Sequence, residues 1–434
     1  MLNASNQDAL HFLRELLNRA IQRALPERNL AAHLPSPPKG RTLVVGAGKA
    51  AASMAQALET LWPSSCELSG LVVTRYGHVP DRDDSIPPRI EIMQAAHPVP
   101  DEQSVLASQK MLELTRGLTE DDLVITLISG GGSSLLTLPV EGMRLEEKQA
   151  LNRSLLRCGA SISEINCVRK HLSAIKGGRL ARACGPARLV TLCISDVPGD
   201  DPATIASGPT VADETTCEQA LRVIEKYQLT LPAPLLDALR SSSLETPKAN
   251  QFDRTRQEVH IIASPKDALE AAAQYAQSMG LNAYILSDEM EGESKEVALV
   301  HAALAKATAK GMGAFTKPCV LLSGGETTVT LAAGEAHGRG GRAGEFCLSL
   351  LKSLGGAPNI WALAADTDGI DGVEDNAGAC MDPMTFERAQ RLGVHVDDHL
   401  SRHDAYSFFE RVGGLVVTGP TFTNVNDFRA ILIL

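Results

Sequence analysis

Short apolar segments alternate along this chain with stretches whose apolar residues recur at helical spacing. The most continuous segment, residues 123–128, is rich in β-branched residues and predicts a strand buried on both faces of a parallel sheet. Further strands are expected at 42–45, 71–74, 90–95, 189–194, 259–263, 283–286, 319–322, 361–365, 415–418 and 431–434. Helices are expected at 7–24, 50–58, 101–115 (capped by Asp101), 146–157, 164–176, 267–278 and 294–310. This alternation predicts an α/β fold.

A polar, charged segment without periodicity, residues 241–257, interrupts this rhythm. A chain of 434 residues is too long for one ordinary hydrophobic core. We therefore expect two Rossmann-like α/β domains with largely parallel sheets and an interdomain cleft. Their predicted bounds are residues 1–245 and 246–434, and the strand at 259–263 is expected to begin the second domain.

Two glycine-rich segments follow predicted strands and are expected to be strand-end turns that cradle phosphates. Glycines let the backbone approach a ligand closely, and the peptide N–H groups of such a turn can converge on an anion. The first candidate site comprises Gly130, Gly131, Gly132, Ser133 and Ser134. The second comprises Gly324, Gly325, Glu326 and Thr327. The alternative for either is a tight connection without a ligand.

A third turn, around Lys49, partly fits a dinucleotide-binding fingerprint. Gly46, Gly48 and Ala51 match G-x-G-x-x-A after a strand, but the next strand ends in Thr74-Arg75, without the acidic residue that holds a ribose. A lysine at this position is expected to attract a carboxylate or phosphate. The alternative is an ordinary solvated lysine.

Strand-end aspartates and scattered cations complete the candidate chemistry. Asp366, Asp368 and Asp371 predict a Mg²⁺–phosphate site, unless they only form an Asp/Gly turn. The cations in or beside glycine-rich segments are Lys49, Arg169, Lys170, Lys176, Arg339 and Arg342. Phosphates, Mg²⁺ and cations are together the requirements of phosphoryl transfer.

Composition restricts the class of partner. The formal net charge is −11 and aromatic residues make up 4%, so neither nucleic acid nor an anionic membrane is expected to bind. The nine cysteines form no CxxC pair, which favours reduced thiols in a cytoplasmic protein. Charged residues interrupt the apolar positions of the N-terminus, so no signal peptide is expected.

The ordered motifs of the chain closely resemble those of the class II glycerate 2-kinases, historically also called hydroxypyruvate reductases, whose C-terminal half is the MOFRL domain. The resemblance extends over nearly the whole chain. It rests on VVGAGKAA (44–51), HPVPD (97–101), SGGGSSLL (129–136), INCVRKHLSAIKGGRLA (165–181), SDVPGDDPATIASGPT (195–210), SGGETTV (323–329), GGRAGEF (340–346), TDGIDG (367–372) and TGPTFTNVND (418–427).

The resemblance implies ATP-dependent, Mg²⁺-assisted phosphorylation of D-glycerate at its C2 hydroxyl. It implies that Lys49 and Arg342 are catalytic, and we add Asp196 as a candidate that orients or deprotonates the hydroxyl. The candidate substrate-binding residues are Lys49, Arg169, Lys170 and Arg342. The candidate metal ligands are Asp196, Asp366 and Asp371. The expected partner is a small hydroxy acid, and a homodimer is a candidate assembly.

Two departures from the family pattern leave alternatives open. Ala343 and Gly344 replace two amide residues beside Arg342, and Phe422 replaces a glycine. Either change is expected to alter the substrate or weaken kinase activity. The first alternative is an NAD(P)H-dependent hydroxypyruvate reductase, which the glycine fingerprint favours. The second is a non-catalytic homologue that binds a small molecule.

Overall fold

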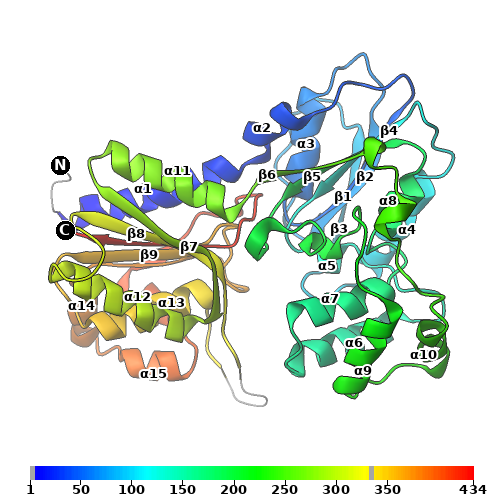
Figure 1. The fold of residues 1–434 in the computed structure, drawn as a ribbon. Helices are drawn as coiled ribbons and strands as arrows, with labels where there is room; N and C mark the ends of the chain where they lie inside the picture. Colours follow the sequence, from blue (N-terminus) through cyan, green and yellow to red (C-terminus); the bar gives the residue numbers. More distant parts are fainter. Residues whose placement is uncertain (1–4, 332–336) are drawn as a thin grey trace. The chain divides into compact units, whose positions relative to one another are not determined.

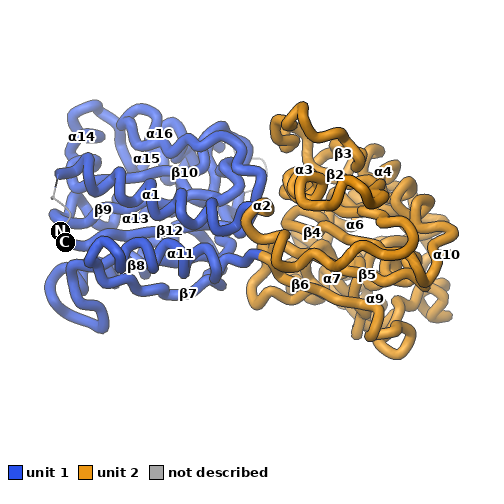
Figure 2. Tube along the Cα trace, turned by 90° about the horizontal axis from the view of Figure 1, so that it is seen from above, with its two compact units in different colours: residues 1–25, 263–434 blue, residues 26–262 orange. Residues whose placement is uncertain are grey.

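The computed structural model describes residues 5–331 and 337–434, and it divides into two compact units. One unit is Pro26–Ile262; the other combines the N-terminal segment through Leu25 with Ala263–Leu434 (Figure 2). We call them the central unit and the terminal unit. The predicted division into residues 1–245 and 246–434 stays a prediction. The two compact units divide the chain at other positions, after Leu25 and after Ile262.

The central unit is built on a six-stranded sheet of order β3-β2-β1-β4-β5-β6. Neighbouring strands from β3 to β5 pair in parallel. The strands are β1 (Thr42–Ala47), β2 (Ser69–Arg75), β3 (Ile90–Ala95), β4 (Leu123–Ile128), β5 (Arg188–Ile194) and β6 (Gln257–Ala263). The expectation that β6 begins the second domain is wrong, because this strand extends the first sheet next to β5.

Helices form two of the hydrophobic cores of the central unit. One core lies between the sheet and α4 and α8, and a second holds α6, α7, α9 and α10 together (Figure 1). The helices are α2 (Pro26–Asn29), α3 (Ala51–Leu61), α4 (Glu102–Leu114), α5 (Gly132–Leu135), α6 (Leu145–Arg157), α7 (Ile162–His171), α8 (Arg179–Cys184), α9 (Cys217–Lys226) and α10 (Ala233–Arg240). The predicted cap is confirmed, since the Asp101 side chain accepts a hydrogen bond from the Ser104 amide.

The terminal unit contains a mixed sheet of order β11-β10-β9-β12-β8-β7. Only β7 and β8 pair in parallel among its described ladders, because β12 runs antiparallel to both neighbours. The strands are β7 (Asn282–Glu293), β8 (Cys319–Thr328), β9 (Ile360–Asp366), β10 (Gly378–Met381), β11 (Leu415–Val416) and β12 (Asp427–Ile433). The α/β class is confirmed, although this second sheet is less parallel than expected.

Helices cover both faces of the mixed sheet. Helices α1 and α11 lie on one face, and α12 and α13 lie on the other (Figure 1). Apolar residues of α1 explain why the N-terminal helix belongs to this unit, since Phe12 stacks on Tyr275 of α11 at 6.0 Å. The helices are α1 (Asn6–Ala24), α11 (Pro265–Ser278), α12 (Ser294–Ala309), α13 (Arg342–Leu354), α14 (Thr385–Arg391), α15 (Val396–Ser401) and α16 (Ala405–Val412). No described helix combines the length and the apolar character needed to cross a bilayer.

The second glycine-rich segment is a strand, so its interpretation as a strand-end turn is wrong. Residues 323–328 continue β8 and pair with β7. Gly325 has φ +105°, and a Cβ there would lie 2.2 Å from the Met290 amide nitrogen. This glycine therefore permits the close approach of two strands where their register shifts.

Phe422 has a left-handed backbone, with φ +59°. A glycine adopts this conformation without strain, so we expect Phe422→Gly to be more stable than Phe422→Ala by about 1 kcal/mol. Urea unfolding in a Trp62→Phe background, with Trp361 as reporter of the terminal unit, measures the difference. The same pair of substitutions at Phe252, where φ is −117°, serves as control and is expected to reverse the order. Equal stability of the two Phe422 variants would contradict the strain.

Candidate functional site

Three predicted site segments meet at one edge of the central sheet. The strands β1, β4 and β5 are parallel neighbours, so their carboxyl ends lie together. Lys49 follows β1, residues 130–134 follow β4, and Asp196 follows β5. The structure thus brings these predicted residues to one sheet edge within the central unit.

The backbone around Lys49 is fixed by hydrogen bonds. The Lys49 amide donates to the Gly130 carbonyl at 2.8 Å, and the Thr74 hydroxyl donates to the Lys49 carbonyl at 3.2 Å. The Ala50 amide donates to the Ser129 hydroxyl at 3.0 Å. Main-chain contacts therefore fix the backbone of Lys49 at the carboxyl end of β1.

The triple-glycine turn packs tightly on the segment around Ser207. Gly131 has φ +80°, and a Cβ at Gly132 would lie 2.6 Å from the Ala206 Cβ. The Ser133 and Ser207 hydroxyls are 2.9 Å apart, while Ser134 donates to the Pro98 carbonyl at 2.6 Å. Both serine hydroxyls thus have internal partners, and phosphate binding by this turn stays a prediction.

Sequence reasoning assigned no role to Arg75, His78 or His97, which lie near Lys49. Burial and then the charges of Lys49 and Arg75 together lower the pKa of His97 to about 3. Burial and the same two cations lower the pKa of His78 to about 4. Both imidazoles are therefore neutral near pH 7. Two features of the sequence could have identified this group: the HPVPD motif, which begins with His97, and Arg75 at the end of β2.

Arg342 is the centre of the candidate site in the terminal unit. Its guanidinium lies 2.5 Å from Glu326 Oε1, 2.7 Å from Asp366 Oδ2 and 2.6 Å from Asp427 Oδ1. Burial lowers the pKa of Arg342, but the nearby carboxylates outweigh it and raise that pKa well above its ordinary value. The three carboxylates come from β8, β9 and β12, so the sheet itself holds this arginine in place.

Asp427, which sequence reasoning missed, links two arginines. It is 3% exposed, and its carboxylate pairs with both Arg342 and Arg429. The amide and hydroxyl of Thr327 each donate to Asp427 Oδ2 at 3.2 Å. In the sequence, only the TNVND motif, which ends at Asp427, pointed to this residue. Thr327, predicted to bind phosphate, therefore contributes to orienting the Asp427–Arg342 pair.

Asp371 caps helix α13. Its carboxylate accepts from the Ala343 amide at 3.0 Å and from the Gly344 amide at 2.8 Å. Burial, with the negative charges of Asp366 and Asp427, raises the pKa of Asp371 to about 7, although the two amide hydrogen bonds oppose this rise. The residues that depart from the family pattern thus supply their backbone amides to this cap. A side chain at position 344 would lie 3.1 Å from both the Ala405 Cβ and Asp371 Oδ2.

The residues Asp366 and Asp371 do not fit a Mg²⁺ site in this arrangement. Asp366 accepts from Arg342 through Oδ2 and from the Asp368 amide through Oδ1. Both oxygens of Asp371 accept helix amides. A metal bound by this pair would have to replace a guanidinium and helix-capping bonds. Asp196 remains as the predicted metal ligand.

The two predicted cations of α7 have partners within the central unit. Lys170 forms a buried ion pair with Asp213 at 3.2 Å, so its charge is compensated inside the fold. Arg169 donates from Nε to the Asn152 side chain at 3.3 Å. A role for either residue in substrate binding stays a prediction.

Lys148 is buried with a carbonyl as its partner, since its ammonium donates to Leu172 at 2.9 Å. Burial, followed by the charges of Arg169 and Arg179, lowers the pKa of Lys148 to about 7. The folded state therefore binds this proton less readily than the unfolded state, and the protein gains stability as pH rises from about 7 to about 10.

We expect Lys148→Met to raise the free energy of unfolding by about 1 to 4 kcal/mol at pH 7, because a buried charge is removed. The advantage is expected to shrink as pH rises toward about 10, because the wild-type amine is neutral in the folded state there and the unfolded state begins to lose its proton. Urea unfolding at both pH values measures this difference in stability. A Trp361→Phe background leaves Trp62 as the sole tryptophan and as the reporter of the central unit. Lys110→Met, which removes an exposed ion pair with Glu91, is the control. A difference independent of pH would contradict the assignment.

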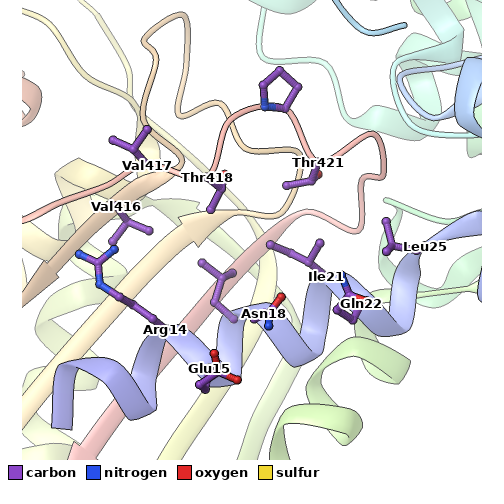
Figure 3. Close-up of a pocket in the computed structure, with 12 residues that line it drawn as sticks. Arg14, Glu15, Asn18, Ile21, Gln22, Leu25, Val416, Val417, Thr418 and Thr421 are labelled. Atoms are coloured by element: carbon purple, nitrogen blue, oxygen red, sulfur yellow. The ribbon is translucent and has the colours of Figure 1, made fainter. Parts of the chain in front are cut away.

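A pocket of about 440 Å³ lies elsewhere on the terminal unit (Figure 3). It lies between α1 and residues 416–421, and its lining includes Arg14, Asn18 and Thr418. The Thr421 hydroxyl donates to the Thr367 carbonyl at 2.6 Å. The pocket wall is therefore connected to the loop after β9, but the pocket contains none of the predicted catalytic side chains.

The fold and these sites define a class: an α/β protein with cations at sheet edges, suited to small anionic substrates. Residues 12–240 match the family model of a domain of unknown function, DUF4147, and residues 319–427 match the MOFRL family. Together with the relatives described next, these matches show that the chain belongs to the glycerate kinase family with a MOFRL domain. The resemblance noted in the sequence is confirmed.

Relatives match the chain over nearly its full length. A putative hydroxypyruvate reductase of Agrobacterium vitis is 52% identical, covering 98% of this chain and 94% of its own. The D-glycerate 2-kinase of Thermotoga maritima is 39% identical, covering 97% of each chain. The crystal structure of a glycerate kinase from Thermotoga maritima has a TM-score of 0.87 and 38% identity, covering 99% of this chain and 100% of its own.

Proposed function

We propose that this protein is a glycerate 2-kinase, which transfers the γ-phosphoryl group of ATP to the C2 hydroxyl oxygen of D-glycerate. The phosphoryl group leaves ADP, a new P–O bond forms at C2, and the hydroxyl proton passes to a base or to water. The full-length match to the Thermotoga maritima D-glycerate 2-kinase carries the proposal. The positions of Lys49 and Arg342 support it.

In this mechanism the two cations neutralise anionic oxygens. Lys49 projects from a backbone fixed by Gly130 and Ser129, and Arg342 is held rigidly by three carboxylates. Preorganised cations of this kind stabilise the charge of a transferring phosphoryl group. Glu326 and Thr327 position Arg342, directly or through Asp427, while residues 130–134 are proposed to bind nucleotide phosphates. Bound Mg²⁺ would neutralise phosphate charge, with Asp196 as its proposed ligand.

An assay of ADP release tests the proposal. Purified protein with ATP and Mg²⁺ is offered D-glycerate, L-glycerate and related hydroxy acids, and the product is identified by NMR. We expect release with D-glycerate and a phosphate on C2. Release no faster than without an acceptor would overturn the kinase proposal. Hydroxy-acid binding without turnover would instead support the non-catalytic alternative.

Hydroxypyruvate reductase is the second candidate, favoured by the name of the Agrobacterium vitis relative. The turn from Gly46 to Ala51 fits a dinucleotide, and Arg75 ends β2, where an arginine can accommodate the 2′-phosphate of NADP. Incubation with hydroxypyruvate and NADH or NADPH, followed by the loss of the reduced-nicotinamide absorbance, tests it. Lys49 within the turn argues against this candidate.

A further inference from the structure

Two polar side chains at the carboxyl edge of the central sheet have no use in the fold. Arg75 is the last residue of β2, and His97 lies just beyond the end of β3. Within residues 5–331 and 337–434, neither the guanidinium nor the imidazole forms a hydrogen bond or an ion pair. Both are only partly exposed. Partly buried polar groups without partners are costly, which points to a ligand.

The residues Arg75, His97 and Lys49 lie close together at the carboxyl ends of three neighbouring strands. The strands β3, β2 and β1 are parallel neighbours, and Arg75 pairs in register with Ala95, two residues before His97. A Cβ built on Gly131 would lie 3.1 Å from His97 Nε2 and 3.3 Å from Lys49 Cγ. The imidazole and the lysine therefore flank the glycine turn that follows β4.

The charges that act on His97 are positive. The electrostatic causes that lower the pKa of His97 are Lys49, Arg75 and His78, and no acidic residue contributes. The nearby carboxylate of Asp101 accepts a hydrogen bond from the Tyr76 hydroxyl and caps α4. These positive charges would attract an anion bound beside His97.

We propose that Arg75 and His97 join Lys49 in binding an oxyanion, either the carboxylate of the hydroxy acid or a phosphate of the nucleotide. This inference deepens the proposed function and rests on it. A planar guanidinium binds either oxyanion through two parallel hydrogen bonds. A neutral His97 supplies one N–H donor without a further positive charge.

Steady-state kinetics of Arg75→Ala, Arg75→Lys and wild type separates the two oxyanions. Loss of a charge-assisted pair is expected to raise one KM about 100-fold. A higher KM for D-glycerate with an unchanged KM for ATP assigns the carboxylate, and the reverse assigns the phosphate. Arg75→Lys is expected to recover part of the loss. Arg153→Ala on α6, which removes an exposed arginine, is the matched control. Unchanged KM values for both substrates would overturn the proposal.

His97→Ala and His97→Gln provide a second measurement. We expect His97→Ala to raise the same KM about 10-fold, and His97→Gln, which retains an N–H donor, to recover most of it. A wild-type protein that releases no ADP would reject the kinase function but leave this site testable. Calorimetric titration of wild type and Arg75→Ala with D-glycerate and with inorganic phosphate then tests whether Arg75 binds an oxyanion. Equal affinities of both proteins for both ions would reject the oxyanion site.

Discussion

Replacement of Arg342 by alanine is expected to lower kcat about 1,000-fold and to destabilise the terminal unit by about 3 to 5 kcal/mol. The first effect follows from the loss of a preorganised cation. The second follows because Asp366 and Asp427, which are 4% and 3% exposed, would remain buried without their common counterion. Arg342→Lys is expected to recover only part of either loss, because a lysine cannot contact three carboxylates with a planar fork.

The stability loss is expected to depend on pH in a defined direction. Burial raises the pKa of Asp427, and Arg342 opposes that rise, so removal of Arg342 raises the pKa further. A carboxyl group whose folded pKa exceeds its unfolded value loses stabilisation as pH rises through the folded value. The difference between variant and wild type should therefore be larger at pH 8 than at pH 5.

Urea unfolding in a Trp62→Phe background, with Trp361 of β9 as reporter, measures both quantities for the terminal unit. Arg339→Ala is the matched control, since Arg339 pairs with Glu374 while 53% of its side chain is exposed. Its ion pair contributes about 0 to 1 kcal/mol, and its guanidinium, 3.9 Å from the centre of the Tyr406 ring, adds about 0.5 to 1 kcal/mol, so this control should change stability less than Arg342→Ala. An Arg342→Ala protein as stable as the control would show that the three carboxylates do not depend on this arginine.

Lys49→Met is expected to lower kcat/KM about 1,000-fold while leaving the unfolding midpoint of the central unit nearly unchanged. The main-chain hydrogen bonds that fix the backbone at Lys49 are retained by methionine. Lys39→Met, at an exposed position before β1, is the control. A turnover within a few-fold of wild type would remove Lys49 from the mechanism.

A titration gives a readout of Lys49 that does not depend on activity. Burial is the first cause of the low pKa of His97, and the Lys49 charge is the second. Lys49→Met should therefore raise the pKa of His97 from about 3, while burial keeps it below the ordinary value near 6.5. Histidine NMR, with the resonance assigned by His97→Gln, follows this change. An unchanged pKa would contradict the proximity of the two side chains.

Periodicity and strand order explain what the sequence could predict. Buried parallel strands are recognisable as apolar runs, and their carboxyl ends share one edge, which brings together Lys49, the turn after β4 and Asp196. By contrast, the three partners of Arg342 lie on separate strands of a mixed sheet. Their convergence depends on antiparallel pairing of β12, which local pattern does not reveal.

Other features were missed because one residue type serves two physical purposes. Gly325 suggested a turn, yet it permits the close approach of β7 and β8. Asp371 suggested a metal ligand, yet it caps α13. Arg75 entered the sequence analysis only because it stands where a dinucleotide-binding strand would end in an acidic residue. In each case the tertiary partner, and not the residue type, determines the role.

The course of the chain, in which the central unit is inserted between α1 and the rest of the terminal unit, has a consequence for synthesis on the ribosome. Residues 26–262 contain their own cores and emerge before the strands against which α1 packs. The amphipathic face of α1 must therefore wait, exposed, until residues 263–434 have been made. We therefore expect the central unit to fold first during translation. Helix α1, although it is synthesised first, is buried only when the terminal unit folds.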